Sequence, residues 1–119
     1  MIEQGRAIFQ QIADQVADSI IDGALAEESR APSTNELATF YRINPATAAK
    51  GVNLLVDKGV LYKRRGIGMF VATGAAELLQ RQRRESFADR YLDPLLAEAT
   101  RLGLTPADVV DLITNRSTP

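Results

Sequence analysis

The chain has 119 residues, enough for one small domain with an appendage, and 45% of them are hydrophobic. It contains no cysteine and no histidine, which excludes disulfides, thiolate metal sites and the commonest general base. An enzyme is therefore disfavoured, and neither a metal nor a cofactor is expected. Residues 1–6 lack the apolar core of a signal peptide, and no apolar run approaches the roughly 20 residues that cross a bilayer, so no membrane partner and a cytoplasmic location are expected.

The net charge of −1 conceals a segregation of charge along the chain. Residues 1–40 carry two basic and seven acidic side chains, residues 41–84 carry nine and two, and residues 85–119 carry three and six. A basic middle between acidic flanks is the pattern of a footprint for a polyanion that is confined to one face of a protein.

Hydrophobic residues recur every fourth position from Ile8 to Asp22, which predicts an amphipathic helix that Gly23 ends. On its outer face Asp14, Asp18 and Asp22 lie one turn apart. We interpret them as a solvated acidic face and not as a cation site, because carboxylates on one helix make a poor cage without further oxygen ligands.

A loop or very short strand over residues 24–32 leads to a second helix, which begins at a capping box. In this box the Ser33 hydroxyl accepts a hydrogen bond from the amide of Glu36, and the Glu36 carboxylate accepts one from the amide of Ser33. The helix is predicted to reach about Tyr41 and to bury three apolar residues: Leu37, Phe40 and Tyr41.

A third helix begins after a turn at residues 42–44, with Asn44 as its N-cap and Pro45 at its first position. Two helix starts with only a turn between them predict a helix-turn-helix. Gly51 inside the third helix indicates that another element approaches closely there, and Gly59 ends the helix.

The third helix has two different sides. One side is apolar and is predicted to pack on the earlier helices. The other side consists of Pro45, Ala46, Ala49, Lys50 and Asn53. Its side chains are small in the first turns, so this side of the helix can enter a groove deeply.

Two short strands, Val60–Arg64 and Met69–Ala72, are predicted to form a hairpin whose tight reversal is allowed by Gly66 and Gly68. The predicted fold class is therefore mostly α: a winged helix-turn-helix of three helices and a two-stranded wing over residues 1–73. The wing exposes three basic side chains, Lys63, Arg64 and Arg65.

Residues 74–119 are predicted to form a helical dimerisation segment. Its first helix starts at Ala75, is kinked or broken near residues 92–93 because of Pro94, and ends at Gly103. A last helix follows with Thr105 as its cap, and the final residues are expected to fray.

This segment is too small to bury its own apolar stripe, so a second copy of the chain is expected to cover it. The expected dimer interface consists of Phe87, Tyr91, Leu92, Leu95, Ala99, Leu102, Val109 and Ile113.

Three stretches, residues 32–38, 43–48 and 64–71, resemble the DNA-binding domain of GntR-family bacterial transcriptional regulators, and residues 97–105 resemble the YtrA subfamily. The most specific parts are the Pro-Ser-Thr-x-Glu-Leu box, the Asn-Pro helix start and the Arg-Arg-Gly-x-Gly-x-Phe-Val wing. The resemblance implies a homodimeric repressor that binds an inverted-repeat operator in double-stranded DNA and often controls a nearby transport operon. No small-molecule effector is assigned.

The predicted DNA contacts fall into three groups. Side chains at the start of the second helix suit a phosphate, and those at the start of the third suit base edges, with Lys50 chosen for guanine. The wing arginines suit phosphate or the minor groove. The full set is Ser33, Thr34, Asn35, Asn44, Pro45, Ala46, Thr47, Ala49, Lys50, Arg64, Arg65 and Gly66.

Four positions depart from the family pattern. Asn35 and Ala49 stand where arginine is frequent, Ile67 stands where lysine is frequent, and Arg42 replaces the usual turn glycine. If the turn needs a left-handed backbone, Arg42 costs on the order of 1 kcal/mol. We expect DNA affinity to be modest and to depend on the wing and on dimerisation.

Two other functions are compatible with a small domain of this kind. A winged helix can act as a protein–protein interaction module, but that leaves the basic middle of the chain unexplained. An enzyme lacks support because the sequence has no nucleophile and base pair and no phosphate loop. Arg81, Arg83 and Arg84 fit a charged helix face at least as well as flanking phosphate contacts.

Overall fold

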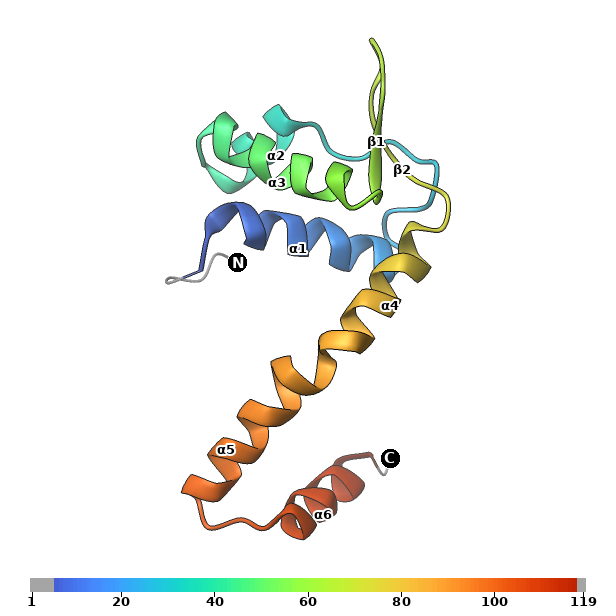
Figure 1. The fold of residues 1–119 in the computed structure, drawn as a ribbon. Coiled ribbons are helices and arrows are strands. Elements are labelled where there is room, and N and C mark those ends of the chain that lie inside the picture. Colours follow the sequence, from blue (N-terminus) through green and yellow to red (C-terminus); the bar gives the residue numbers. More distant parts are fainter. Residues whose placement is uncertain (1–5, 118–119) are drawn as a thin grey trace. The chain divides into compact units, whose positions relative to one another are not determined.

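The computed structural model describes residues 6–117, which form helices and one two-stranded sheet (Figure 1). Residues 1–5, on which the expectation of no signal peptide partly rests, and residues 118–119 of the tail lie outside this range. The chain divides into two compact units, the first ending at Arg81 and the second beginning at Gln82. None of the helices within residues 6–117 is long and apolar enough to cross a membrane.

The first unit is built on three helices: α1 (Ile8–Ile21), α2 (Thr34–Tyr41) and α3 (Pro45–Asp57). α3 packs against both α1 and α2, and Figure 1 shows α1 running beside α3. The core that they share with the sheet includes Ile12, Val16, Ile20, Leu37, Ala48, Val52, Leu55, Val60, Leu61 and Val71.

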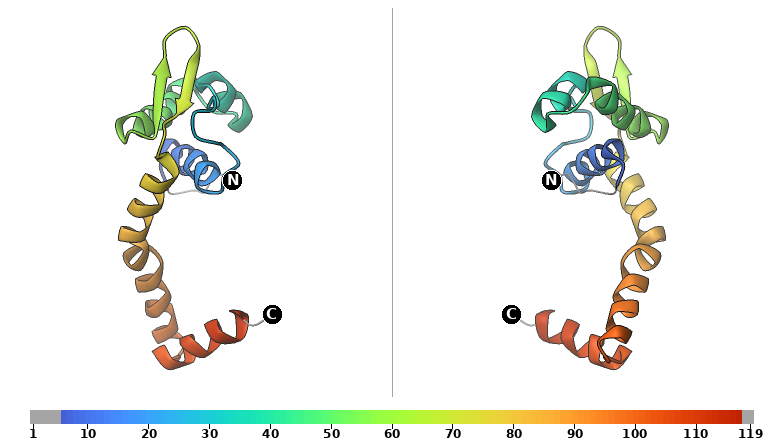
Figure 2. Two further views of the ribbon diagram at one scale, coloured as in Figure 1. Left: turned by 90° about the vertical axis from the view of Figure 1, so that its right-hand side faces the viewer. Right: turned by 90° about the vertical axis from the view of Figure 1, so that its left-hand side faces the viewer.

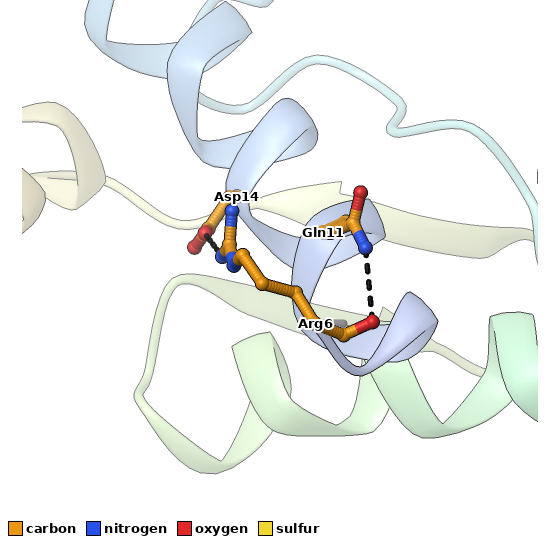
Figure 3. Close-up of polar contacts among 3 residues, drawn as sticks. All are labelled: Arg6, Gln11 and Asp14. Atoms are coloured by element: carbon orange, nitrogen blue, oxygen red, sulfur yellow. Dashed lines mark hydrogen bonds and ion pairs between the residues drawn. The ribbon is translucent and has the colours of Figure 1, made fainter. Parts of the chain in front are cut away.

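The N-cap residue of α1, Ala7, has no side chain that can cap the helix. Two other polar contacts hold the chain at this helix start. Arg6 Nη2 lies 2.6 Å from Asp14 Oδ2, and Gln11 Nε2 donates to the Arg6 carbonyl oxygen at 3.1 Å (Figure 3). Gln11 is only 3% exposed, so this bond satisfies an amide that would be costly to leave unpaired. Asp14, predicted as part of an acidic face, is in an ion pair.

Both predicted helix starts of the helix-turn-helix are confirmed. Ser33 Oγ accepts from Glu36 N at 3.0 Å, and Glu36 Oε1 accepts from Ser33 N at 2.9 Å. Asn44 Oδ1 accepts from Ala46 N at 2.8 Å, and Pro45 begins α3. Each cap supplies an acceptor for an amide that has no partner inside the helix, which sets where the helix begins.

The turn between α2 and α3 has a left-handed backbone at Arg42, the condition under which this residue carries a conformational cost. Arg42 has φ 55° and ψ 51°, and the flanking hydrogen bonds run from Ile43 N to Ala38 O (3.0 Å) and from Arg42 N to Thr39 O (3.3 Å). This is a Schellman motif in which a side chain occupies the position that favours glycine.

The predicted burial of Phe40 is wrong, because its side chain is 78% exposed. Its ring contacts Tyr41 edge to face at 4.9 Å, while Tyr41 is half-buried and its hydroxyl donates to Gln15. α2 buries Leu37 and Ala38 instead. α2 packs mainly on α3, which leaves its Phe40 side on an open hollow of about 700 Å³ bordered by α1.

α1 approaches α3 closely at Gly51, as the place of this glycine in the sequence indicated. A Cβ added there would lie 2.7 Å from the carbonyl oxygen of Phe9 and 3.4 Å from Cβ of Ile12. Only glycine fits without displacing α1 backbone.

The wing is an antiparallel hairpin of β1 (Leu61–Arg64) and β2 (Gly68–Val71), and it extends beyond the helices of the first unit (Figure 2). Its register pairs Leu61 with Val71 at the buried end and Arg64 with Gly68 near the tip. β1 begins one residue later than predicted and ends at Arg64 as predicted, whereas β2 begins and ends one residue earlier than predicted.

The segment of residues 28–31 lies along the other side of β2. Ala31 N donates to Met69 O at 2.8 Å, Val71 N donates to Ser29 O at 3.0 Å, and an isolated antiparallel bridge joins Arg30 to Phe70. The segment expected as a loop or very short strand is therefore a loop that pairs with β2 through one isolated bridge.

The second unit continues from α4 (Ala75–Phe87), whose first turns belong to the first unit, through a π-helical segment, η1 (Ala88–Leu92), into α5 (Asp93–Arg101). The amide of Asp93 donates to the carbonyl of Ala88, five residues earlier. This wide turn accommodates Pro94, which lacks an N–H group and whose ring would clash in a regular helix. The predicted kink or break is thus a π-helical segment.

Gly103, at φ 73°, ends α5, with Leu104 N donating to Ala99 O at 2.8 Å. Thr105 caps α6 (Pro106–Ser117) as predicted, because its Oγ1 accepts from Asp108 N at 3.1 Å. The Asp108 carboxylate accepts from Thr105 N at 2.8 Å, and this bond, followed by hydrogen bonding to the Thr105 side chain, lowers the pKa of Asp108.

Candidate nucleic-acid interface

The start of α2 presents Ser33, Thr34 and Asn35, of which the first two are half-buried and the third is exposed. The amide of Ser33 and then its hydroxyl lower the pKa of Glu36, so the carboxylate stays ionised and occupies part of this helix end. The Ser33 oxygen also accepts from Glu36 N, so this hydroxyl interacts with both the amide and the carboxylate of Glu36. A phosphate here would meet the Thr34 side chain.

The start of α3 presents a row of small side chains. Asn44, Pro45 and Ala46 are exposed, while Thr47 and Ala49 are half-buried. With Asn44 committed to its cap, Thr47 is the polar side chain of this set that is left for a base edge, and the alanine methyl groups suit the methyl group of thymine.

Lys50 is exposed on the next turn of α3, and its Nζ lies 4.3 Å from the ring centroid of Phe9 on α1. Both residues border a shallow hollow of about 430 Å³ with Ala46, Ala49 and Asn53. An exposed cation–π contact is worth about 0.5–1 kcal/mol, whereas a good base contact discriminates by about 1–3 kcal/mol. The ring contact is therefore weak enough for Lys50 to leave, and its guanine contact stays a prediction.

The two wing arginines have different surroundings. Cζ of Arg64 lies 4.6 Å from the Phe70 ring centroid, so this guanidinium rests against the side of the hairpin. Arg65 is exposed at the tip beside Gly66, whose φ of 77° suits glycine, and the turn is closed by a bond from Ile67 N to Arg64 O at 2.9 Å. The tip thus offers Arg65 and bare backbone to a groove.

Sequence reasoning missed Phe9 and Arg30, which lie beside predicted contact residues. Phe9 lies against Lys50. Arg30 falls in the segment expected to be a loop or a very short strand, and its guanidinium lies beside Gly68 in the wing. Contacts between residues so far apart in sequence leave no local pattern.

A third missed residue, Glu28, ties the wing to the chain just before α4. Its Oε2 accepts from the Thr73 hydroxyl at 2.6 Å and from the Thr73 amide at 3.0 Å, and its Oε1 accepts from the Tyr62 hydroxyl. Glu27 Oε1 accepts from the Gly74 amide at 2.8 Å. The bonds from Thr73 and Tyr62 hold the pKa of Glu28 below its usual value.

In the second unit the eight predicted interface residues separate into two sets. Ala99 and Val109 are buried within a single chain, where α5 and α6 pack together. The other six are exposed, with Phe87 at 60% and Leu102 at 65%. A hollow of about 280 Å³ beside them is lined by Leu95, Glu98, Ala99, Leu102, Leu104, Val109, Leu112, Ile113 and Arg116.

Residues 6–117 contain no group of three histidine, cysteine, aspartate or glutamate side chains that could hold a metal ion. The features present are a capped helix-turn-helix, a close-packed third helix and a basic hairpin. Together they define the class of winged-helix DNA-binding proteins.

The sequence profile described as "Bacterial regulatory proteins, gntR family" matches residues 8–71, which is more than half of the chain. The chain belongs to the GntR family. The members of this family are DNA-binding transcriptional regulators and not enzymes.

Three relatives illustrate the extent of the similarity. The repressor YtrA of Bacillus subtilis is 31% identical over 72 residues, 60% of this chain and 55% of YtrA, so this chain spans about half the length of that relative. The crystal structure of a GntR-family protein from Bacteroides thetaiotaomicron is 33% identical, covers 92% of this chain and 95% of that one, and superposes with a TM-score of 0.71. The DNA-binding domain of AraR, solved in complex with the operator ORR3, is 30% identical over 54% of this chain and 77% of that one, with a TM-score of 0.52.

Proposed function

We propose that this protein is a homodimeric, YtrA-like repressor that acts in the cytoplasm on an inverted-repeat operator, with a transport operon as its expected target. The observation that carries the proposal is that one compact unit presents both an exposed, small-residue start of α3 and a basic wing. The operator complex of AraR and the repressor name of YtrA support it.

The two-fold character of the proposed operator depends on a dimer. Six exposed apolar side chains on the segment from Phe87 to Ile113 are more than a helical appendage of this size leaves to water without a partner. A second copy covers them with an identical stripe, and a two-fold pair carries two recognition helices to two half-sites.

DNA binding is tested by fluorescence anisotropy with a duplex from the promoter region of the chain's own gene and a scrambled duplex of equal length. We expect the promoter duplex to bind at least about 1,000-fold more tightly at physiological salt. The double variant Arg64→Ala/Arg65→Ala should weaken binding to both duplexes and flatten the salt dependence, because the wing supplies phosphate contacts.

Arg101→Ala is the matched control for the loss of positive charge, because Arg101 is exposed on α5 and pairs with Glu98 at 3.1 Å. Equal affinity for promoter and scrambled DNA would contradict operator recognition. Absence of binding to either duplex, with capture of a partner protein instead, would favour the protein-interaction module.

A further inference from the structure

The backbone around Arg30 is paired with the wing although Arg30 lies in a loop. Its neighbours Ala31 and Ser29 exchange backbone hydrogen bonds with β2, and Arg30 itself bridges Phe70. Residues 28–31 therefore lie along the side of β2 that faces away from β1, joined to it by this isolated bridge and its flanking hydrogen bonds.

The register places Arg30 on the same face of the wing as Arg64. Residues directly opposite each other in antiparallel strands share a face, and so do residues two apart in one strand. Arg30 pairs with Phe70, Arg64 pairs with Gly68, and Gly68 and Phe70 are two apart. The two arginines therefore flank Gly68 from its two sides.

The side chains follow this geometry. Nε of Arg30 lies 3.1 Å from the position that a Cβ on Gly68 would occupy, so its guanidinium lies across the space that the glycine leaves empty. The guanidinium of Arg64 lies over the ring of Phe70. A side chain at residue 68 would displace the Arg30 guanidinium, and its φ of 141° also favours glycine.

Both guanidinium groups retain their donors. Among residues 6–117 neither Arg30 nor Arg64 donates a side-chain hydrogen bond, and both side chains are exposed. Each guanidinium interacts electrostatically with one carboxylate: Arg30 with Glu36, and Arg64 with Glu28. Each carboxylate already accepts hydrogen bonds from other groups, Glu36 from Ser33 and Glu28 from Thr73. The N–H donors of the two guanidinium groups therefore stay available to a ligand.

We propose that Arg30 and Arg64, on either side of Gly68, form one binding site for a DNA backbone phosphate. Two planar guanidinium groups on one face give the bidentate donor geometry that phosphate oxygens accept. The site joins the wing to the loop that leads into α2, and this inference rests on the proposed function.

The test uses the full chain with Arg30→Gln, Arg64→Gln, the double variant and the charge control Arg101→Gln. Affinity for the promoter duplex and for a scrambled duplex is measured across a salt series. Arg30→Gln should weaken both by about tenfold and reduce the slope of log K against log[salt] by about one. Because the two arginines share a phosphate, the double variant should lose less than the sum of the single losses.

Arg30→Lys keeps the charge but not the fork, so it should keep most of the slope and lose part of the affinity. Arg30→Gln binding with the affinity and slope of Arg101→Gln, or losses that add fully, would overturn the shared site while leaving the proposed function intact. If the unaltered chain binds neither duplex, the proposed function fails and the site fails with it.

Discussion

At the scale of single residues, Arg42 occupies a backbone conformation that favours glycine. The left-handed region costs an L-residue about 1–2 kcal/mol, which a glycine would avoid. Part of this gain in stability is lost because glycine makes the unfolded chain more flexible. Arg42→Gly should therefore raise the free energy of unfolding by up to about 1 kcal/mol in urea titration. Arg42→Ala, which removes the same charge and keeps the strain, should show no gain.

Gly51 should behave in the opposite way. Alanine has the higher helix propensity by about 1 kcal/mol, but its methyl group would lie 2.7 Å from the Phe9 carbonyl oxygen. Overpacking of this kind costs about 1–3 kcal/mol, so the clash should win and Gly51→Ala should lower the urea midpoint. Asn53→Ala, on the exposed side of α3, is the control; a Gly51→Ala chain as stable as that control would show that α1 can shift.

At the scale of elements, the capping box of α2 serves two purposes that substitutions at Ser33 can separate. Ser33→Ala removes the cap and should cost about 1 kcal/mol of stability. Ser33→Asp keeps a good cap but places a negative charge where a phosphate is expected. Its urea midpoint should stay near that of the unaltered chain while its DNA affinity falls, and an unchanged affinity would remove Ser33 from the interface.

The tie between the wing and the start of α4 should be sensitive to acid. The hydrogen bonds from Thr73 and Tyr62 hold the pKa of Glu28 below its usual 4.5. A carboxyl whose folded pKa is depressed contributes stability above its unfolded pKa, and this contribution is lost as the pH falls through the folded pKa. Glu28→Gln should therefore lower stability at neutral pH and flatten the decline below pH 4.5, as followed by urea midpoints across the pH series. A decline as steep as that of the unaltered chain would contradict this.

Local hydrogen bonding explains which elements could be predicted from the sequence. The box at Ser33 and the Asn44 cap join residues two or three positions apart, so the pattern of residue types carries them. The Phe9 contact with Lys50 and the Arg30 bridge join residues about 40 apart, and nothing local marks them. Phe40 was misjudged for the same reason: helical spacing gives the face of α2, and only tertiary packing decides which face is covered.

At the scale of the whole molecule, the dimer is the prediction on which operator symmetry depends. A charge placed among the six exposed apolar residues must be desolvated in the pair, so Phe87→Glu or Ile113→Glu should convert a dimer to a monomer in light scattering at micromolar concentration. Thr100→Glu, at an exposed polar position on α5, should remain dimeric. A monomeric mass for the unaltered chain would refute the proposal.

The wing also bears on how the protein behaves in concentrated solution. Within residues 6–117, β2 has neighbours on both sides, whereas β1 has one, so one row of its backbone N–H and C=O groups is open. Open strand edges recruit strands from other molecules, and cationic side chains along the edge discourage this by repulsion. Lys63 and Arg64 stand on that edge. Variants that replace these cations with apolar residues should therefore lose solubility as well as affinity for DNA.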